Sequence, residues 1–224
     1  AQRLAKVEQD RAVMLAGISH DLRTPLARLR LETEMSVSDL DARAHMAADI
    51  AQLDAIIGKF LDYARPEKEK LTPVVLSDVV EACTYSYQNQ PDVQIKIQLE
   101  DNLLVLADEV ELGRIVSNLL ENARRYGKSA DSGIASIQIA AIARDKWVLM
   151  KIRDHGIGVA AEQLSNLTQP FYRGEAARTA ANGAGLGLAI VEKTVQRMGG
   201  AFSLTNATSG GLSANIRLPR VTSD

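Results

Sequence analysis

The chain has 224 residues, which is enough for one large or two small domains, and we expect two. With 46% hydrophobic, 24% charged and 4% aromatic residues, its composition excludes a disordered, collagen-like or disulfide-stapled protein. The net charge of −2 provides no positive field for a polyanion, so we expect no nucleic-acid partner. The single cysteine, Cys83, cannot form an internal disulfide, which fits a reducing compartment.

The chain contains no run of about 18 apolar residues, so none of its segments is expected to span a membrane. It opens at Ala1 and is already inside a helical pattern there, which predicts a piece of a longer protein. Any contact with a membrane is therefore expected only through segments absent from this sequence.

The first predicted element is a long amphipathic helix over about residues 4–33. One stripe of this helix is apolar and comprises Leu15, Ile18, Leu22, Leu26 and Leu29. Ser38, with Asp41 three residues later, predicts the start of a second helix, which Pro66 ends. Two helices joined by a short loop predict an antiparallel hairpin, and its uncovered apolar seam predicts pairing with a second copy in a four-helix bundle.

Beyond Lys70 the pattern changes to mixed helices and strands. We expect helices at about residues 78–88, 109–126 and 187–199, and strands at about 93–99, 103–107, 136–144, 146–154, 202–206 and 212–218. Asp108 and Glu111 form a capping-box pattern, and only one short helix is expected between 160 and 182. The predicted fold class is α+β, with a helical hairpin at residues 1–66 followed by an α/β sandwich at 71–220.

His20 is the first candidate for chemistry. It lies about 160° around the helix from the apolar stripe, so we expect it to face solvent. Pro25, within the same helix, removes the hydrogen bond to the Asp21 carbonyl and predicts a kink that costs about 3 kcal/mol. The histidine is therefore expected beside a strained turn.

Thr24 lies one turn beyond His20 on the same face. Ala27 and Leu31 continue this face as small or apolar positions, away from the seam. The pattern predicts a docking surface for another protein, and a second core contact is the alternative.

These residues belong to a set of motifs. The stretch SHDLRTPL at 19–26 resembles the phosphoacceptor box of sensor histidine kinases. The stretches NLLENARRY at 118–126, DHGIG at 154–158, FYRG at 171–174 and GAGLGL at 183–188 resemble that family's asparagine, first-glycine, phenylalanine and second-glycine boxes, in order and spacing. The resemblance covers nearly the whole chain and is closest to the EnvZ-like osmosensor type.

The resemblance implies the cytoplasmic catalytic core of a dimeric two-component kinase, part of a bacterial inner-membrane protein, with an ATP-binding domain of the histidine kinase, Hsp90 and gyrase type. ATP and Mg²⁺ would bind the sandwich, and the γ-phosphoryl group would pass to His20 and then to an aspartate of a response-regulator receiver domain. By the same resemblance, Asp21 orients His20 or takes its proton. The resemblance also implies that Thr24 serves a phosphatase activity toward the regulator.

The asparagine box also has a physical interpretation. Asn118 and Asn122 are four residues apart on a helix, so both amides lie on one face, and amide oxygens suit Mg²⁺. Two polar surface residues are the alternative. The resemblance makes Asn122 the Mg²⁺ ligand with Asn118 supporting it, and places Arg125 near the phosphates and Tyr126 against the adenine.

The glycine boxes suggest the rest of the site. Asp154 at a strand end can accept a hydrogen bond from an adenine amino group, while Gly156 and Gly158 let the backbone approach the ring; an Asp-Gly turn is the alternative. The second glycine box precedes a helix whose backbone amides can bind phosphate, and it comprises Gly183, Gly185, Leu186 and Gly187.

The remaining expectations concern a lid over the nucleotide and a short stretch that resembles a P-loop. Phe171 and Arg173 would grip a lid over ATP at about residues 160–182. Gly127 is followed by Lys128 and Ser129, but they end a helix and Asn122 stands where a P-loop needs its first glycine, so this is not a P-loop.

Two rival functions use the same folds. A non-catalytic dimeric adaptor would keep the hairpin without the chemistry, and the intact boxes argue against it. An ATP-driven machine of the chaperone or topoisomerase kind shares the sandwich, but that class usually has a glutamate where Asn118 stands and needs no histidine hairpin.

Overall fold

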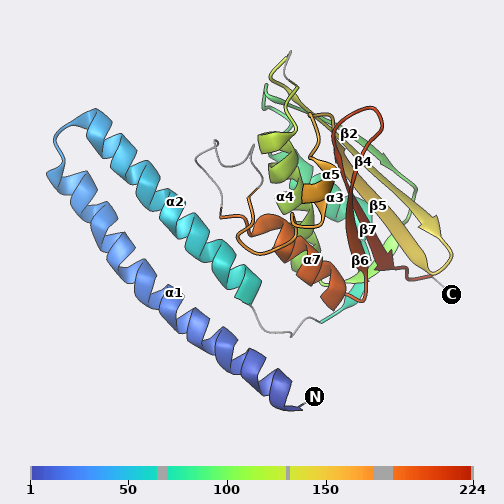
Figure 1. Ribbon diagram of the computed structural model, residues 1–224, viewed down its shortest axis with the longest axis horizontal. Coiled ribbons are helices and arrows are strands. Elements are labelled where there is room, and N and C mark those ends of the chain that lie inside the picture. Colours follow the sequence, from blue (N-terminus) through green and yellow to red (C-terminus); the bar gives the residue numbers. More distant parts are fainter. Residues whose placement is uncertain (1, 65–69, 130–131, 174–183, 223–224) are drawn as a thin grey trace. The chain divides into compact units, whose positions relative to one another are not determined.

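The computed structural model describes residues 2–64, 70–129, 132–173 and 184–222, with side chains described from residue 17 on except at 19, 20 and 64 (Figure 1). Two compact units make up the chain, a helical hairpin and an α/β unit, and we describe each by itself. Among the helices of the described residues, none is both long enough and apolar enough to cross a membrane.

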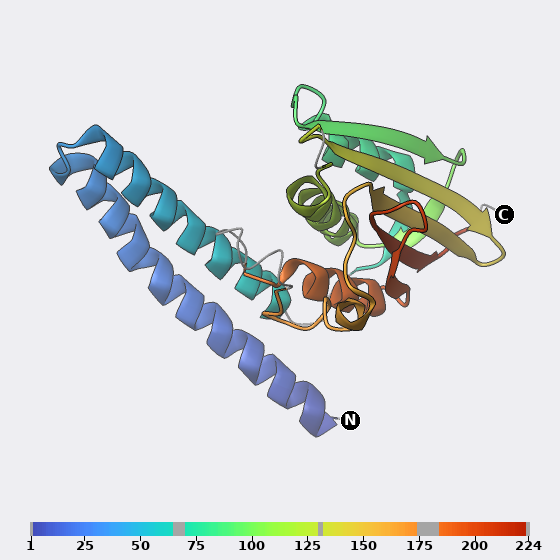
Figure 2. The ribbon, with the colours of Figure 1, turned by 45° about the horizontal axis from the view of Figure 1, so that its top comes forward.

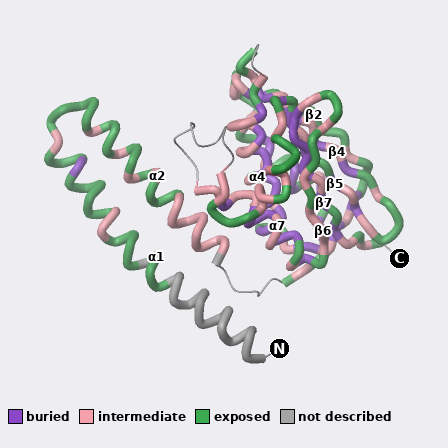
Figure 3. Tube along the Cα trace, in the orientation of Figure 1, coloured by how far each residue is buried: buried purple, intermediate pink, exposed green. Residues whose placement is uncertain are grey.

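The hairpin consists of α1 (Gln2–Ser36) and α2 (Leu40–Ala64), and α1 continues through Pro25 without interruption. The helices run antiparallel, as predicted, and Arg23 Nε lies 3.3 Å from Asp54 Oδ1 across them. Figure 3 shows that most described residues of the hairpin are exposed or intermediate in burial. Thr33 is an exception, since it is buried and its hydroxyl donates to the Leu29 carbonyl at 2.8 Å.

The second helix is capped by Asp39, and the prediction of a cap at Ser38 was wrong. Asp39 Oδ1 accepts a hydrogen bond from the Ala42 amide at 2.9 Å. Because α2 begins at Leu40, the residue directly before it occupies the capping position, where a carboxylate satisfies one of the helix's free amides.

The α/β unit is built on a five-stranded sheet with the strand order β2-β4-β5-β7-β6. The strands are β2 (Val93–Leu99), β4 (Ala135–Arg144), β5 (Trp147–Asp154), β6 (Ala201–Asn206) and β7 (Leu212–Pro219). β2 and β4 are parallel, and the other neighbours are antiparallel. Figures 1 and 2 show helices on one face of this sheet, which confirms the predicted α/β sandwich.

The described residues of this unit form the helices α3 (Leu76–Tyr85), α4 (Glu109–Tyr126), the short α5 (Ala161–Leu164) and α7 (Gly187–Arg197). α3 begins and ends two to three residues earlier than the predicted range of 78–88. It begins directly after β1 (Thr72–Val75), a strand that the sequence analysis missed and that pairs with β3 (Leu104–Ala107). β1 has four residues, one of them Pro73, so it carries little strand signal.

The core lies between the sheet and these helices, as the buried segments in Figure 3 show. Alternate residues of the central strands are buried, as in Ile137, Ile139 and Ala141 of β4. α4 buries residues at helical spacing, namely Leu112, Ile115, Val116, Leu119, Leu120 and Ala123. The position of α4 is thus determined by the apolar face it packs on the sheet.

Asp108 caps the start of α4, as predicted. Asp108 Oδ1 accepts from the Glu111 amide at 3.1 Å, as expected. The Glu111 side chain lies buried with Oε1 at 3.2 Å from Arg114 and Oε2 at 3.8 Å from Arg197 of α7. This carboxylate therefore links α4 to α7.

Candidate functional site

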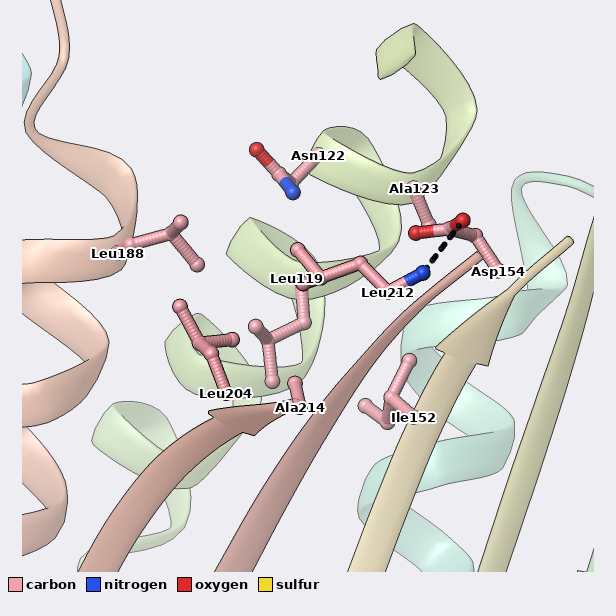
Figure 4. Close-up of a pocket in the computed structure, with 9 residues that line it drawn as sticks. All are labelled: Leu119, Asn122, Ala123, Ile152, Asp154, Leu188, Leu204, Leu212 and Ala214. Atoms are coloured by element: carbon pink, nitrogen blue, oxygen red, sulfur yellow. Dashed lines mark hydrogen bonds between the residues drawn. The ribbon is translucent and has the colours of Figure 1, made fainter. Parts of the chain in front are cut away.

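A pocket lies between α4, α7 and the sheet of the α/β unit (Figure 4). Most of its lining is apolar, and the lining residues are Leu119, Asn122, Ala123, Ile152, Asp154, Leu188, Leu204, Leu212 and Ala214. Asn122 and Asp154 are its two polar residues, although 32 positions separate them in the sequence. An apolar cleft with a few placed polar groups is typical of a site for a small organic ligand.

Asp154 is the most constrained residue of the pocket. Its side chain is buried, and Oδ1 accepts two backbone hydrogen bonds, from Gly156 N at 3.0 Å and from Leu212 N at 3.1 Å. Figure 4 shows the second of these bonds. No residue of the described chain donates to Oδ2, so this oxygen can accept a hydrogen bond from a ligand.

Three glycines give the backbone room around Asp154. A Cβ at Gly127 would lie 2.4 Å from Asp154 Cβ, and one at Gly211 would lie 2.0 Å from the Asp154 carbonyl oxygen. A Cβ at Gly156 would lie 2.8 Å from Gly127 Cα. Side chains at these positions would displace the carboxylate or its donors.

The sequence analysis assigned Gly156 to the site but missed Gly127 and Gly211. Gly127 follows the last residue of α4, which is a signal for a helix end. Gly211 lies 57 residues after Asp154, and no local sequence pattern predicts that the two residues are in contact.

The two asparagines of α4 face the start of α7, as their spacing predicted for a shared face. Asn122 lines the pocket together with Leu188 of α7. Asn118 Nδ2 donates to the Arg114 carbonyl at 2.9 Å, and Asn118 Oδ1 lies 3.4 Å from the position of a Cβ on Gly187. The donor set, with an amide oxygen turned toward a helix N-terminus, fits a hard cation bound together with an anion.

Arg125 and Tyr126 lie in the last turn of α4 and do not line the described pocket. The Arg125 guanidinium is 2.8 Å from Glu121 Oε1, one turn earlier on the helix. The roles of Arg125 at phosphates and of Tyr126 at adenine stay predictions.

The second glycine box leads directly into α7. Gly185 has φ +67°, Leu186 follows it, and Gly187 is the first residue of the helix. Gly183 lies outside the described residues. A glycine is required at 185, because other residues rarely adopt this left-handed backbone conformation.

The last part of the predicted lid lies outside the described residues, since the segment 174–183 is not described. Phe171 has φ +65° and a side chain that is 60% exposed, and Arg173 is half-buried. Neither lines the pocket, so their roles as grips stay predictions.

The candidate acceptor residues lie in the hairpin unit. The backbone of His20 belongs to α1, and its side chain lies outside the description. Asp21, Thr24 and Ala27 are exposed, and Leu31 is 59% exposed. The docking surface at Ala27 and Leu31 and the alternative of a second core contact both stay predictions, because the predicted seam residues are exposed in one copy as well.

Comparison with protein families gives two adjacent matches. The model described as "His Kinase A (phospho-acceptor) domain" matches residues 10–69, and the model described as "Histidine kinase-, DNA gyrase B-, and HSP90-like ATPase" matches residues 107–222. Together they cover the hairpin and most of the α/β unit.

Curated relatives agree with these matches. The chain is 33% identical to the signal transduction histidine-protein kinase BaeS of Escherichia coli (strain K12) over 98% of this chain and 49% of the relative. It is 32% identical to the sensor protein RstB of the same strain, over 92% of this chain and 48% of the relative. A third relative is the histidine-protein kinase/phosphatase MprB of Mycolicibacterium smegmatis, at 29% identity over 93% of this chain and 44% of the relative. The chain spans about half the length of these relatives.

Solved structures share the fold. Full-length ShkA in complex with AMPPNP has a TM-score of 0.74 at 24% identity, covering 94% of this chain and 46% of that chain. The mycobacterial sensor histidine kinase MprB has a TM-score of 0.58 at 25% identity, covering 69% of this chain and all of that one.

The packing around Asp154 predicts that Gly127→Ala destabilises the α/β unit by about 1–3 kcal/mol, because the new methyl group overlaps Asp154. Gly113→Ala, within α4, is the control. A Cβ there makes only ordinary contacts at 3.9 Å or more, so this variant gains up to about 1 kcal/mol of helix propensity. Urea unfolding measures both, and equal effects of the two substitutions would contradict the steric argument.

Proposed function

Because the chain belongs to the sensor histidine kinase family, we propose that it is the catalytic core of a two-component signalling protein. Residues 1–66 serve dimerisation and phosphotransfer, and residues 71–220 bind ATP. The core is a protein histidine kinase, in the cytoplasm, and any membrane anchor lies in segments outside this sequence.

The observation that supports the proposal is the pairing of Asp154 and Asn122 in one apolar pocket of the ATPase-like unit. The free acceptor Asp154 Oδ2 suits an adenine amino group, and the apolar walls suit the ring. A site for a charged ligand alone would not need seven apolar lining residues.

The phosphates of ATP extend toward α7 in this proposal. Backbone amides at the N-terminus of α7, approached through Gly185, bind phosphate oxygens by their partial positive charge. Asn122 and Asn118 would hold Mg²⁺ through their amide oxygens. When bound, the cation would supply positive charge that neutralises the phosphates.

The phosphoryl acceptor is His20. A ring nitrogen of the neutral imidazole forms the bond to the γ-phosphorus as the bond to the β-phosphate oxygen breaks, and ADP leaves. Asp21, the next residue, accepts the ring proton or orients the ring. The phosphoryl group then passes to an aspartate of a response-regulator receiver domain.

A homodimer brings two hairpins into a four-helix bundle. Three residues of the predicted seam, Ile18, Leu22 and Leu29, are 44–48% exposed in one copy. Covering them with a second copy removes this apolar area from water, which favours association.

The adenine contact predicts that Asp154→Asn weakens ATP binding about 10- to 150-fold. The new amide can keep its oxygen on the Gly156 and Leu212 amides, but it then presents a donor, not an acceptor, to the adenine amino group. Calorimetric titration with Mg-ATP measures the affinity. Asp145→Asn, at an exposed turn, is the control, and unchanged affinity of Asp154→Asn would remove Asp154 from adenine recognition.

The test of the proposed reaction is His20→Gln, which we expect to abolish the acid-labile, base-stable phosphate formed from labelled ATP, because glutamine offers no nucleophilic ring nitrogen. His45→Gln, at an exposed position of α2, should leave labelling unchanged. Labelling of the His20 variant at the wild-type rate would exclude His20 as the acceptor.

A second activity, dephosphorylation of the regulator, is favoured by the exposure of Thr24 one turn from His20 and beside Ala27 and Leu31. A hydroxyl there can position water for attack on the regulator's acyl phosphate. The alternative is that Thr24 bonds back to a helix carbonyl, as threonines often do.

We therefore expect Thr24→Ala to retain autophosphorylation and to lose regulator dephosphorylation, with Ser36→Ala at the exposed end of α1 as the control. Phosphate release from the phosphorylated regulator measures the second activity. A parallel fall of both activities would assign Thr24 to helix structure.

A further inference from the structure

Asn206, a residue outside all of the motifs, connects the edge of the sheet to the segment that follows Asp154. It is the last residue of β6, the edge strand. Its Oδ1 accepts from the Val159 amide at 3.0 Å, and its Nδ2 donates to the Val159 carbonyl. The Asn206 side chain thus forms hydrogen bonds with both the amide and the carbonyl group of Val159, which lies 47 positions earlier in the chain.

The backbone at Gly158 is adapted to this contact. Gly158 has φ +74°, and a Cβ there would lie 2.9 Å from Asn206 Oδ1. The side-chain amide therefore occupies the space that any other residue at 158 would fill. The same glycine that the motif assigns to the nucleotide site also admits Asn206.

The contact holds one end of a short segment whose other end touches Asp154. Gly156 N donates to Asp154 Oδ1, and three residues later Val159 is bound by Asn206. β6 itself contributes Leu204 to the pocket, two residues before Asn206. Both ends of the segment 156–159 are thus bonded to elements that line the pocket.

We propose that Asn206 is a positioning residue for nucleotide binding, which holds the segment 156–159 in the conformation that the nucleotide requires. The inference rests on the proposed function. Without Asn206, the segment keeps its hydrogen bond at Gly156 but loses those at Val159. ATP then has to order the Val159 end when it binds, and this entropic cost lowers the affinity for ATP. Asn206 is exposed, so its loss affects the core little.

The test compares Asn206→Ala with Asn215→Ala. Asn215 lies on β7, and its Nδ2 donates to Thr205 Oγ1 at 3.1 Å, so the control removes an asparagine bonded only within the sheet. We expect Asn206→Ala to raise the Kd and KM for Mg-ATP roughly 3- to 10-fold with little change in kcat, and Asn215→Ala to change neither. Fluorescence of Trp147, the single tryptophan, checks that both variants unfold at similar denaturant concentrations.

Asn206→Asp separates the two hydrogen bonds. Its shape is nearly the same and it keeps an acceptor for the Val159 amide, but its second oxygen faces the Val159 carbonyl oxygen and repels it. We expect affinity as weak as that of Asn206→Ala. Affinity equal to the wild type in either variant would overturn the inference.

A double-mutant cycle tests the juxtaposition itself. Gly158→Ala clashes with Asn206 Oδ1 only while the asparagine is present, so we expect the two losses of ATP affinity to be less than additive. Strict additivity would contradict the proposed coupling. If the wild type fails to bind ATP, the proposed function falls; if it binds and the Asn206 variants match it, only this inference falls.

Discussion

A buried carboxylate needs hydrogen-bond donors, because an unpaired charge away from water costs several kcal/mol. Asp154 meets this requirement with two backbone amides, from Gly156 just after β5 and from Leu212 at the start of β7. Both donors reach Oδ1 only if β5 and β7 are neighbours and if no side chain stands at Gly127 or Gly211. The strand order and the absence of side chains at Gly127 and Gly211 are thus what allow the Asp154 carboxylate to be buried with Oδ2 still able to accept a hydrogen bond.

Much of this architecture could be predicted from local patterns. The alternation of buried residues along β4 and the helical spacing of buried residues along α4 are properties of a few consecutive residues, so both elements were expected at nearly their observed bounds. Asp154 and Asn122 were likewise expected in the site from their motifs. The structure adds that the two line one pocket, a contact across 32 residues that spacing alone does not specify.

Features that depend on distant residues could not be predicted. β1 is a strand because β3 offers it a partner, and Glu111 of α4 has a buried ionic partner in Arg197 of α7. Gly127, Gly211 and Asn206 act through contacts with Asp154 or Val159, and no local pattern predicts these contacts, although Gly127 does mark the end of α4. Long-range contacts of this kind decide the shape of the pocket, whereas periodicity decides only which elements exist.

The strand order also determines when the pocket can form during synthesis. β7 emerges from the ribosome after β6 yet lies between β5 and β6 in the sheet, so β6 has no neighbour in the five-stranded sheet until the last strand is inserted. Until then Leu204 lacks its place in the pocket and Asp154 lacks the Leu212 amide. Because domains fold as units and long-range strand pairing is slow, the pocket is complete only once β7 has paired with both β5 and β6.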